Sequence, residues 1–261
     1  MIMSPVKTRY PWNLERQYAK DINGLVTDWN HGATLFLRVY LKRFVNGGTG
    51  LKLDDATNDL NWSDNIQRQI SLLGFSIEQA SQNNNRITNI ATKFVRSLNS
   101  FSYMNVKEQT AIVGLDPISD NTVFRNWVKT HIGYNVSLIT TMRENYTNSL
   151  KNDIYRSITK GGGTRDIANA IVKRTHMARE HAQLIATDQT GKIISQFDAY
   201  RAKSAGAEKY VWRSMEDSRV RPKHRELDGR TFKYNDPAGG DDGQLPGEPI
   251  RCRCVATPIF D

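Results

Sequence analysis

Residues 199–214, AYRAKSAGAEKYVWRS, contain the change of periodicity that decides the fold class. Before Gly206 the apolar residues recur every three or four positions, which indicates a helix, and Gly206 is placed to end it. After it, Tyr210 and Trp212 occupy alternate positions, as do Val211 and Arg213, which is typical of a strand. We therefore predict an α+β protein, with an N-terminal helical hairpin or arm, further helices, and a small loop-rich C-terminal domain with short strands.

Two long helices are predicted in the first hundred residues. Asn13 is placed to cap the first, which continues for about thirty residues until NGGTG at 46–50 closes the pattern. Gly24 and Gly32 predict a kink or a close contact, because a glycine inside a helix costs about 1 kcal/mol relative to alanine. Residues 46–62 are rich in turn formers and predict a connection.

The second helix is predicted to begin at Ser63 or Asp64 and to carry a regular apolar seam. Asn84 interrupts this seam and would fix its register. The seam favours an antiparallel hairpin with the first helix, and an intermolecular coiled coil is the alternative. We accordingly predict an extended helical arm over 1–100 and a second domain over 101–261. The seam consists of Ile66, Ile70, Leu73, Ile77, Ala80, Asn84, Ile87, Ala91, Phe94 and Leu98.

The segment from 99 to 204 predicts more helices separated by breaks. Residues 99–120 predict a break with a short helix, and 121–160 a long helix. Gly161–Gly163 lack the spacing of a phosphate-binding loop and predict a tight turn between helices. A short helix capped by Thr164 and another from about Ala178 to Ser204 complete the series.

Composition limits the class of protein. The chain has 261 residues, of which 38% are hydrophobic and 24% charged, as expected of one large or two modest globular domains. It has no run of eighteen apolar residues and no signal peptide pattern, so we expect synthesis in a cytoplasm and no membrane partner. Two cysteines indicate that disulfides do not hold the fold together.

The net charge of +9 raises the question of nucleic-acid binding. The excess is +4 over 1–140, +3 over 141–200 and +2 over 201–261, so no segment concentrates it. A dedicated DNA-binding protein more often gathers its charge in an arm or a recognition helix. A generally basic surface is favoured, and such a surface tolerates DNA nearby.

The C-terminal fifty residues predict an irregular domain. They are dense in Gly, Pro and Asp, with strand-like pieces at RTFKY, 230–234, and CRCVATPIF, 252–260. So little periodic apolar sequence cannot build a large core, and support from the preceding helices, polar networks or a bound ion is expected.

An ordered set of motifs here resembles the phage Mu F-like family of minor head proteins. The upstream LIATDQTGKI, with Ile185, Ala186, Asp188 and Gln189, fits the helix that precedes this signature. The resemblance covers roughly 135–257. Its signature residues are Trp212, Asp217, Arg219, His224, Asp228, Gly229, Pro246, Gly247, Cys252 and Cys254.

The resemblance implies a minor capsid protein of a tailed bacteriophage that acts in head morphogenesis. Its implied partners are the portal protein, major capsid or scaffold proteins, and packaged double-stranded DNA during packaging or ejection. The implied location is the virion, in the head interior or at the portal vertex. A DNA-binding accessory protein of the virion is the alternative function.

Cys252 and Cys254 can bind the same ligand, because residues two apart in a strand point to the same face. A disulfide between them would be strained. With His224, and Asp217 or Asp228 as a fourth ligand, they form a candidate structural zinc site. Some relatives place a CxxC pair where this chain has Arg221 and His224. A hydrogen-bonded histidine beside two buried thiols is therefore the competing interpretation.

The sequence contains candidate catalytic groups but does not favour an enzyme. Arg251 and Arg253 can lower the pKa of a nucleophilic thiol paired with His224, although alternation places them on the opposite face. Asp217, Glu226 and Asp228 are candidate carboxylates of a metal-dependent nuclease or hydrolase, but they more simply cap turns and pair with nearby arginines. We predict that the chain is not an enzyme.

Overall fold

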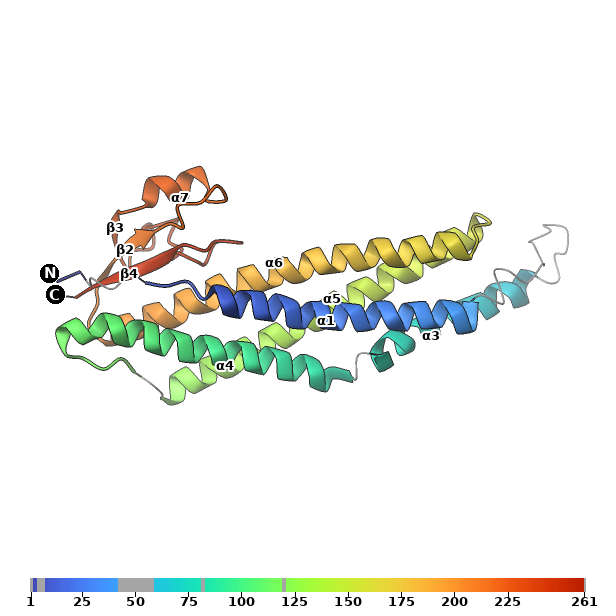
Figure 1. The fold of residues 1–261 in the computed structure, drawn as a ribbon, viewed down its shortest axis with the longest axis horizontal. Helices are drawn as coiled ribbons and strands as arrows, with labels where there is room; N and C mark the ends of the chain where they lie inside the picture. The colour runs from blue at the N-terminus through green and yellow to red at the C-terminus, as the bar shows by residue number, and fades with distance from the viewer. Residues whose placement is uncertain (1, 4–7, 42–58, 81–82, 119–120, 261) are drawn as a thin grey trace. The chain divides into compact units, whose positions relative to one another are not determined.

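The computed structural model combines long helices with a small antiparallel sheet, most of which follows the helices in the sequence (Figure 1). The predicted α+β class is therefore confirmed. Within the described residues, no helix is long and apolar enough to cross a membrane. The structure describes the whole chain apart from residues 1, 4–7, 42–58, 81–82, 119–120 and 261.

The chain divides into two compact units, and each unit combines segments that are far apart in the sequence. The predicted division at residue 100 falls inside a helix and stays a prediction. Unit 1 comprises Met1–Ala19, Ile90–Asn135 and Gln183–Asp261, and unit 2 comprises Lys20–Asn89 and Val136–Ala182.

The helices differ from the predicted ones mainly in where they begin and end. The first is α1, which is extended by a π-helical turn, η1, and thus spans the predicted thirty residues. It begins one residue before Asn13, which therefore is not its N-cap. The bounds are α1 Trp12–Phe36, η1 Leu37–Leu41, α3 Asp59–Ala80, α4 Asn83–Thr110, η2 Ala111–Val113, α5 Thr122–Thr159, α6 Thr164–Ser204 and α7 Pro222–Leu227.

The predicted second helix is two helices, α3 and α4, and it begins at Asp59 instead of Ser63 or Asp64. The two residues between these helices, 81–82, lie outside the described residues. The side chains of Ile66 and Asn84 and the connection before residue 59 lie outside the described residues, so the register role of Asn84 stays a prediction.

Two predicted breaks are absent. Residues 99–110 continue α4, and α6 is one helix of 41 residues where two were predicted. Neither residues 99–110 nor the residues around 175–178, where the second break was predicted, include Gly or Pro, the residues that most strongly end a helix. The helical segment that begins with α4 ends instead at Gly114, and α6 ends just before Gly206. Both glycines lie in the left-handed region, with φ of 68° and 91°. The turn predicted at Gly161–Gly163 is confirmed, since α5 ends at Thr159 and α6 begins at Thr164.

Within unit 2, α1 and α3 pack closely at Gly32. A Cβ built there would lie 2.6 Å from the carbonyl oxygen of Ser76 and 2.9 Å from the Cα of Ile77. The Ser76 hydroxyl also donates to the Gly32 carbonyl over 2.9 Å. The close contact predicted at this glycine is confirmed, and it lies within one chain. A bidentate pair between Arg174 and Asp153 adds a polar contact between α5 and α6.

Unit 1 contains a four-stranded antiparallel sheet in the order β1-β4-β2-β3. The strands predicted at 209–214 and 230–234 are confirmed as β2 and β3. The third prediction is confirmed only from Val255 onward, so both cysteines precede β4. The sequence does not predict β1. The bounds are β1 Ile2–Met3, β2 Lys209–Arg213, β3 Thr231–Lys233 and β4 Val255–Phe260.

A buried polar network joins α4 and α6 within unit 1. The Asn105 amide donates to Asp198 Oδ2 over 2.9 Å, while Asp198 Oδ1 has no partner among the described residues. Arg201 is fully buried, donates to Ser102 over 2.6 Å, and lies over the ring of Phe124. Burial raises the pKa of Asp198 to about 6 and lowers that of Arg201 to about 10.

Candidate metal centre

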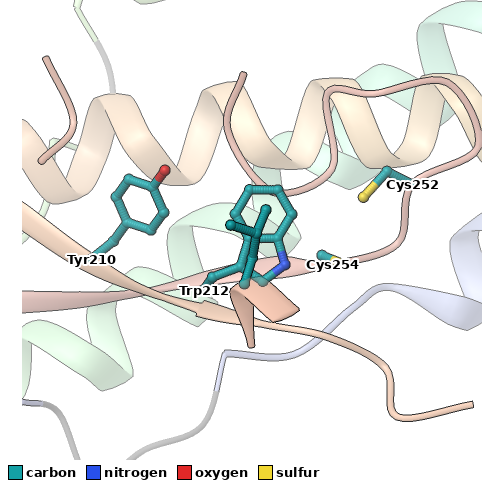
Figure 2. Packing of buried hydrophobic residues seen from close by; sticks show 5 residues of the cluster. Tyr210, Trp212, Cys252 and Cys254 are labelled. Carbon is teal, nitrogen blue, oxygen red and sulfur yellow. The ribbon is translucent and has the colours of Figure 1, made fainter. Parts of the chain in front are cut away.

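His224, Cys252 and Cys254 meet in the core of the small C-terminal domain. Pro222 opens α7 with its fixed φ, and the helix places His224 inward, 3% exposed. The two cysteines lie on the loop before β4 and pack with Tyr210, Trp212 and Leu227 (Figure 2). Both cysteines are free and buried.

The three side chains present their donor atoms to one point. His224 Nδ1 lies 3.5 Å from the sulfur of Cys252 and 3.7 Å from that of Cys254. All three donor atoms fall within 4.8 Å of one another. Zn²⁺ binds thiolate and imidazole donors at roughly 2.0–2.3 Å, which places those donors at such mutual separations.

The other face of His224 is held by a carboxylate that the sequence did not predict. His224 Nε2 lies 3.0 Å from Asp241 Oδ2, and Asp241 also pairs with Lys223. Burial alone would raise the pKa of Asp241, but hydrogen bonds from Lys223 and His224 outweigh it and lower that pKa. The ionised carboxylate accepts a hydrogen bond from the Nε2–H group, and this tautomer leaves the Nδ1 lone pair facing the sulfurs.

The two thiols do not ionise equally. Their mutual hydrogen bond lowers the pKa of Cys252 to about 6, and the same bond together with burial raises the pKa of Cys254. One thiolate forms readily near neutral pH, while the second needs a compensating positive charge. A bound divalent cation would supply that charge, since a coordinated thiol is deprotonated outright.

An orphaned donor gives an independent test of this fit. The indole nitrogen of Trp212 is buried and makes no hydrogen bond of ordinary geometry with the described residues, although it lies close enough to Cys254 to act against the rise in the pKa of that thiol. Figure 2 shows it on the side of the ring that faces Cys254. A thiolate is a better acceptor than a thiol, so a metal-bound Cys254 would reduce the cost of this buried N–H. The residues therefore fit a metal ion.

Glycines on α6 and on the terminal loop allow the loop to approach the helix. A Cβ at Gly191 would collide with the carbonyl oxygens of Cys252 and Gly247, the latter at 2.7 Å. Gly247 has a φ of 101°, which only glycine adopts without strain. The Arg251 amide also donates to Asp188 over 3.3 Å. These contacts give a physical role to Gly247 of the signature and to Asp188 and Gly191 of the helix that precedes it.

The remaining predicted site residues have other partners. Asp217 accepts two hydrogen bonds from Arg253, over 2.6 and 2.8 Å, which lower its pKa. Asp228 Oδ1 accepts from the Ser214 amide over 2.7 Å. Arg253 is thus buried and paired with Asp217. Glu226 is exposed on α7.

The N-terminal segment also reaches this part of unit 1. Arg253 lies over the ring of Trp12, and Tyr10 donates to the buried Glu15 over 2.6 Å. Glu15 further accepts from Thr187 of α6 over 2.8 Å. Tyr10 and Glu15 belong to no recognisable motif, so this contact could not be predicted from the sequence.

The ordered signature and its geometry agree with the comparison to known families. Residues 148–257 match the model of the family described as Phage Mu protein F like protein. Residues 148–257 are phage Mu F-like. The predicted resemblance is confirmed, and the Mu F-like region includes all three residues of the candidate metal centre.

Two curated proteins are similar to the chain, and both are described as uncharacterized. One, from Haemophilus influenzae, is 28% identical over 187 residues, which are 70% of this chain and 41% of that protein. The other, from Methanocaldococcus jannaschii, is 29% identical over 117 residues, 44% of this chain and 18% of that protein. The chain thus spans less than half of either relative. No solved structure matches it significantly.

Proposed function

We propose that the chain is a minor capsid protein that acts in head morphogenesis of a tailed bacteriophage. The observation that carries the proposal is the Mu F-like match over 148–257, combined with a signature whose members hold one another in place. The proposed partners are the portal protein, with major capsid or scaffold proteins around it, and the proposed location is the virion.

A nonsense codon in the gene of the parent phage tests this function. We expect heads to be absent or aberrant by electron microscopy, and wild-type heads to contain the chain by mass spectrometry. Expression of the wild-type chain in trans should restore the heads. The proposal would be contradicted if the mutant formed normal heads by electron microscopy and mass spectrometry found no chain in wild-type heads.

Portal association requires a separate test with the intact chain. Residues 1–19 belong to unit 1, so a truncation of the first hundred residues would also damage the Mu F-like region. Co-sedimentation of the full chain with purified portal is therefore the appropriate measurement. A chain that stays in the supernatant at micromolar portal would exclude this partner.

Packaged DNA is the second proposed partner, favoured by the net charge of +9. Because its excess charge is spread along the sequence, binding should be independent of base sequence and dominated by phosphate contacts. Affinity for duplex DNA should then fall steeply between about 50 and 200 mM salt. A chain that does not bind duplex at low salt would remove DNA from the partners.

We further propose that His224, Cys252 and Cys254 bind a structural zinc ion that links α7 to the terminal loop. When bound, zinc would supply a cross-link to a domain with a small apolar core. Purified protein should contain zinc, and the Cys252→Ser plus Cys254→Ser double variant should contain almost none. The matched control is Arg230→Gln, an exposed position outside the cluster. Equal zinc in all three proteins would refute the site.

A further inference from the structure

We propose that the turn of the α5–α6 hairpin in unit 2 carries the surface that binds the phosphates of duplex DNA. This inference rests on the DNA partner proposed above and adds the part of the chain that contacts the DNA. The surface is named the basic end of the hairpin. It consists of the exposed cations Arg156, Lys160, Arg165 and Lys173.

The hairpin concentrates positive charge that appears evenly spread when it is counted over longer blocks. Residues 151–182 carry seven Lys and Arg against three Asp and Glu, a net charge of +4 out of +9 for the whole chain. The block 141–200 has a smaller excess, because residues 183–200 carry Lys192 against Asp188 and Asp198. The turn between Thr159 and Thr164 brings the charges of the two helices to one end of the hairpin (Figure 1).

Contacts between the two helices show that cations from both lie close together. Arg174 of α6 donates two hydrogen bonds to Asp153 of α5, over 2.6 and 3.0 Å, and these bonds lower the pKa of that carboxyl. The charges of Arg156 and Lys173 also lower this pKa, so both cations lie near the same carboxylate. One carboxylate therefore has three cations around it and is already paired with Arg174.

The cations of the basic end are not neutralised by the other acidic side chains of the hairpin. Asp166 accepts a hydrogen bond from the Gly163 amide over 2.8 Å, and Glu180 contacts His176 at 3.7 Å. Among the described residues, none of the four cations forms an ion pair. Exposed cations without a carboxylate partner can neutralise DNA phosphates, and the release of counterions from the DNA favours this binding.

The spacing of the cations and the small residues of the turn fit a row of phosphates. Arg165 and Lys173 lie eight residues apart on α6. This separation corresponds to about 12 Å of helix, and a duplex axis of that length carries about seven phosphate charges. A Cβ built at Gly161 or Gly163 would meet no atom within 4 Å, so the turn borders open space. A duplex can therefore approach the cations without displacing the turn.

An acidic protein is the competing partner, and the composition of the turn argues against it. Residues 159–166, TKGGGTRD, contain no large apolar side chain. Protein interfaces bury an apolar core inside a polar rim, whereas DNA backbones are bound mainly through cations and polar groups. Tyr155 and Val172 are exposed on different helices, and exposed apolar residues of this kind are common on protein surfaces.

Binding of duplex DNA by the full-length chain tests this surface. In the triple variant Lys160→Gln, Arg165→Gln and Lys173→Gln, we expect the affinity to fall at least about tenfold at about 100 mM salt. The slope of log affinity against log salt should also shrink by about 0.9 for each cation that contacts a phosphate. Fluorescence anisotropy of a labelled duplex of arbitrary sequence, in a salt titration, measures both quantities.

The matched control removes three exposed cations outside the hairpin, in Arg96→Gln, Lys129→Gln and Arg230→Gln. It lowers the net charge by the same amount, so it should bind DNA nearly as wild type does. A second variant, Gly163→Asp, adds a carboxylate to the basic end. It should also weaken DNA binding, and the helix should remain intact because aspartate is a favourable residue just before the first turn of α6.

The outcomes distinguish this inference from the proposals on which it rests. A wild-type chain that binds no duplex at low salt would overturn both this inference and DNA as a partner. Equal losses of affinity in the two triple variants would overturn the basic end alone, because binding would then depend on the general charge. Displacement of the duplex by poly-L-glutamate at equal charge concentration would overturn it in favour of an acidic protein. The test of head morphology above does not depend on any of these results.

Discussion

Gly191 is the residue on which the position of the cysteine loop depends most directly. In Gly191→Ala, the new methyl group would meet two backbone carbonyl oxygens, which cannot move aside as a flexible side chain can. We expect the loop to move off α6 and the free energy of unfolding to fall by roughly 2–4 kcal/mol, as for other overpacked sites. Urea denaturation measures this loss.

Gly133→Ala is the matched control for that substitution. Gly133 also lies in a helix of unit 1, α5, and a Cβ there would meet no atom within 4 Å. Alanine at this position should stabilise the protein by up to about 1 kcal/mol through its helix propensity. If both variants changed stability alike, Gly191 would have no special role in seating the loop.

Asp241 is the second residue whose removal gives a specific result. In Asp241→Asn the carboxylate that orients His224 is lost, and we expect zinc affinity to fall by roughly 10–100-fold. Competition with a chromophoric chelator measures the affinity. Asp242→Asn is the control, because Asp242 pairs with Lys223 but not with His224 and is largely exposed. Equal affinities for the two variants would refute the orienting role.

For individual residues, the sequence predicted the candidate metal donors better than the side chains that contact those donors. His224, Cys252 and Cys254 were foreseen because their chemistry is visible in single letters and their spacing is short. Asp241 was missed because it lies in an aperiodic segment, where nothing in the sequence distinguishes it from Asp236 or Asp242. Asp217 was assigned to the metal because its pairing with Arg253 depends on a fold that the sequence alone does not give.

Among the elements, the contact between α1 and α3 is the most sensitive to a single methyl group. Gly32→Ala would place its Cβ against the backbone of Ser76 and Ile77. The helix propensity of alanine would favour α1 by about 1 kcal/mol, but overpacking against backbone costs roughly 1–3 kcal/mol. We expect a net loss of unfolding free energy in chemical denaturation.

Helical content separates this loss from damage to the helix itself. Circular dichroism of Gly32→Ala should match wild type before the transition, because alanine favours helix. Unfolding should begin at a lower denaturant concentration. A variant that is more stable than wild type would show that α1 and α3 do not approach as closely as described.

Periodicity predicted the existence of the helices but not their ends. Apolar spacing of three and four identified α1, α5 and the seam of α3 and α4, because those faces are buried. The predicted ends were wrong where polar residues such as Asn99, Ser100 and Ser102 were interpreted as a break. Polar side chains also occur inside buried helices when they have partners, as Ser102 does with Arg201.

For the whole molecule, Asp198 should make global stability depend on pH. Its pKa is raised to about 6 by burial, above an ordinary value of 3.8, so its favourable contribution is present at low pH and is lost as pH rises through 6. Asp198→Asn should remove this loss. The unfolding free energy of the variant minus that of wild type should therefore increase by on the order of 2 kcal/mol between pH 4.5 and 7.5.

The comparison with wild type at each pH cancels other titrating groups. Burial lowers the pKa of His131, which acts in the opposite direction over the same range in both proteins. Urea denaturation at the two pH values gives the required four free energies. A difference between variant and wild type that does not change with pH would show that Asp198 is already neutral or solvated.

The pairing of β1 with β4 has a consequence for the order of folding. Ile2 pairs with Phe260, and the Thr8 hydroxyl donates to the Ala256 carbonyl, so contacts join residues about 250 positions apart. Contacts of such sequence separation form slowly, because a long loop must close first. On the ribosome, the first strand to emerge must wait for the last one. We therefore expect the sheet of unit 1 to form only after synthesis has passed residue 260, later than the local helical pairs.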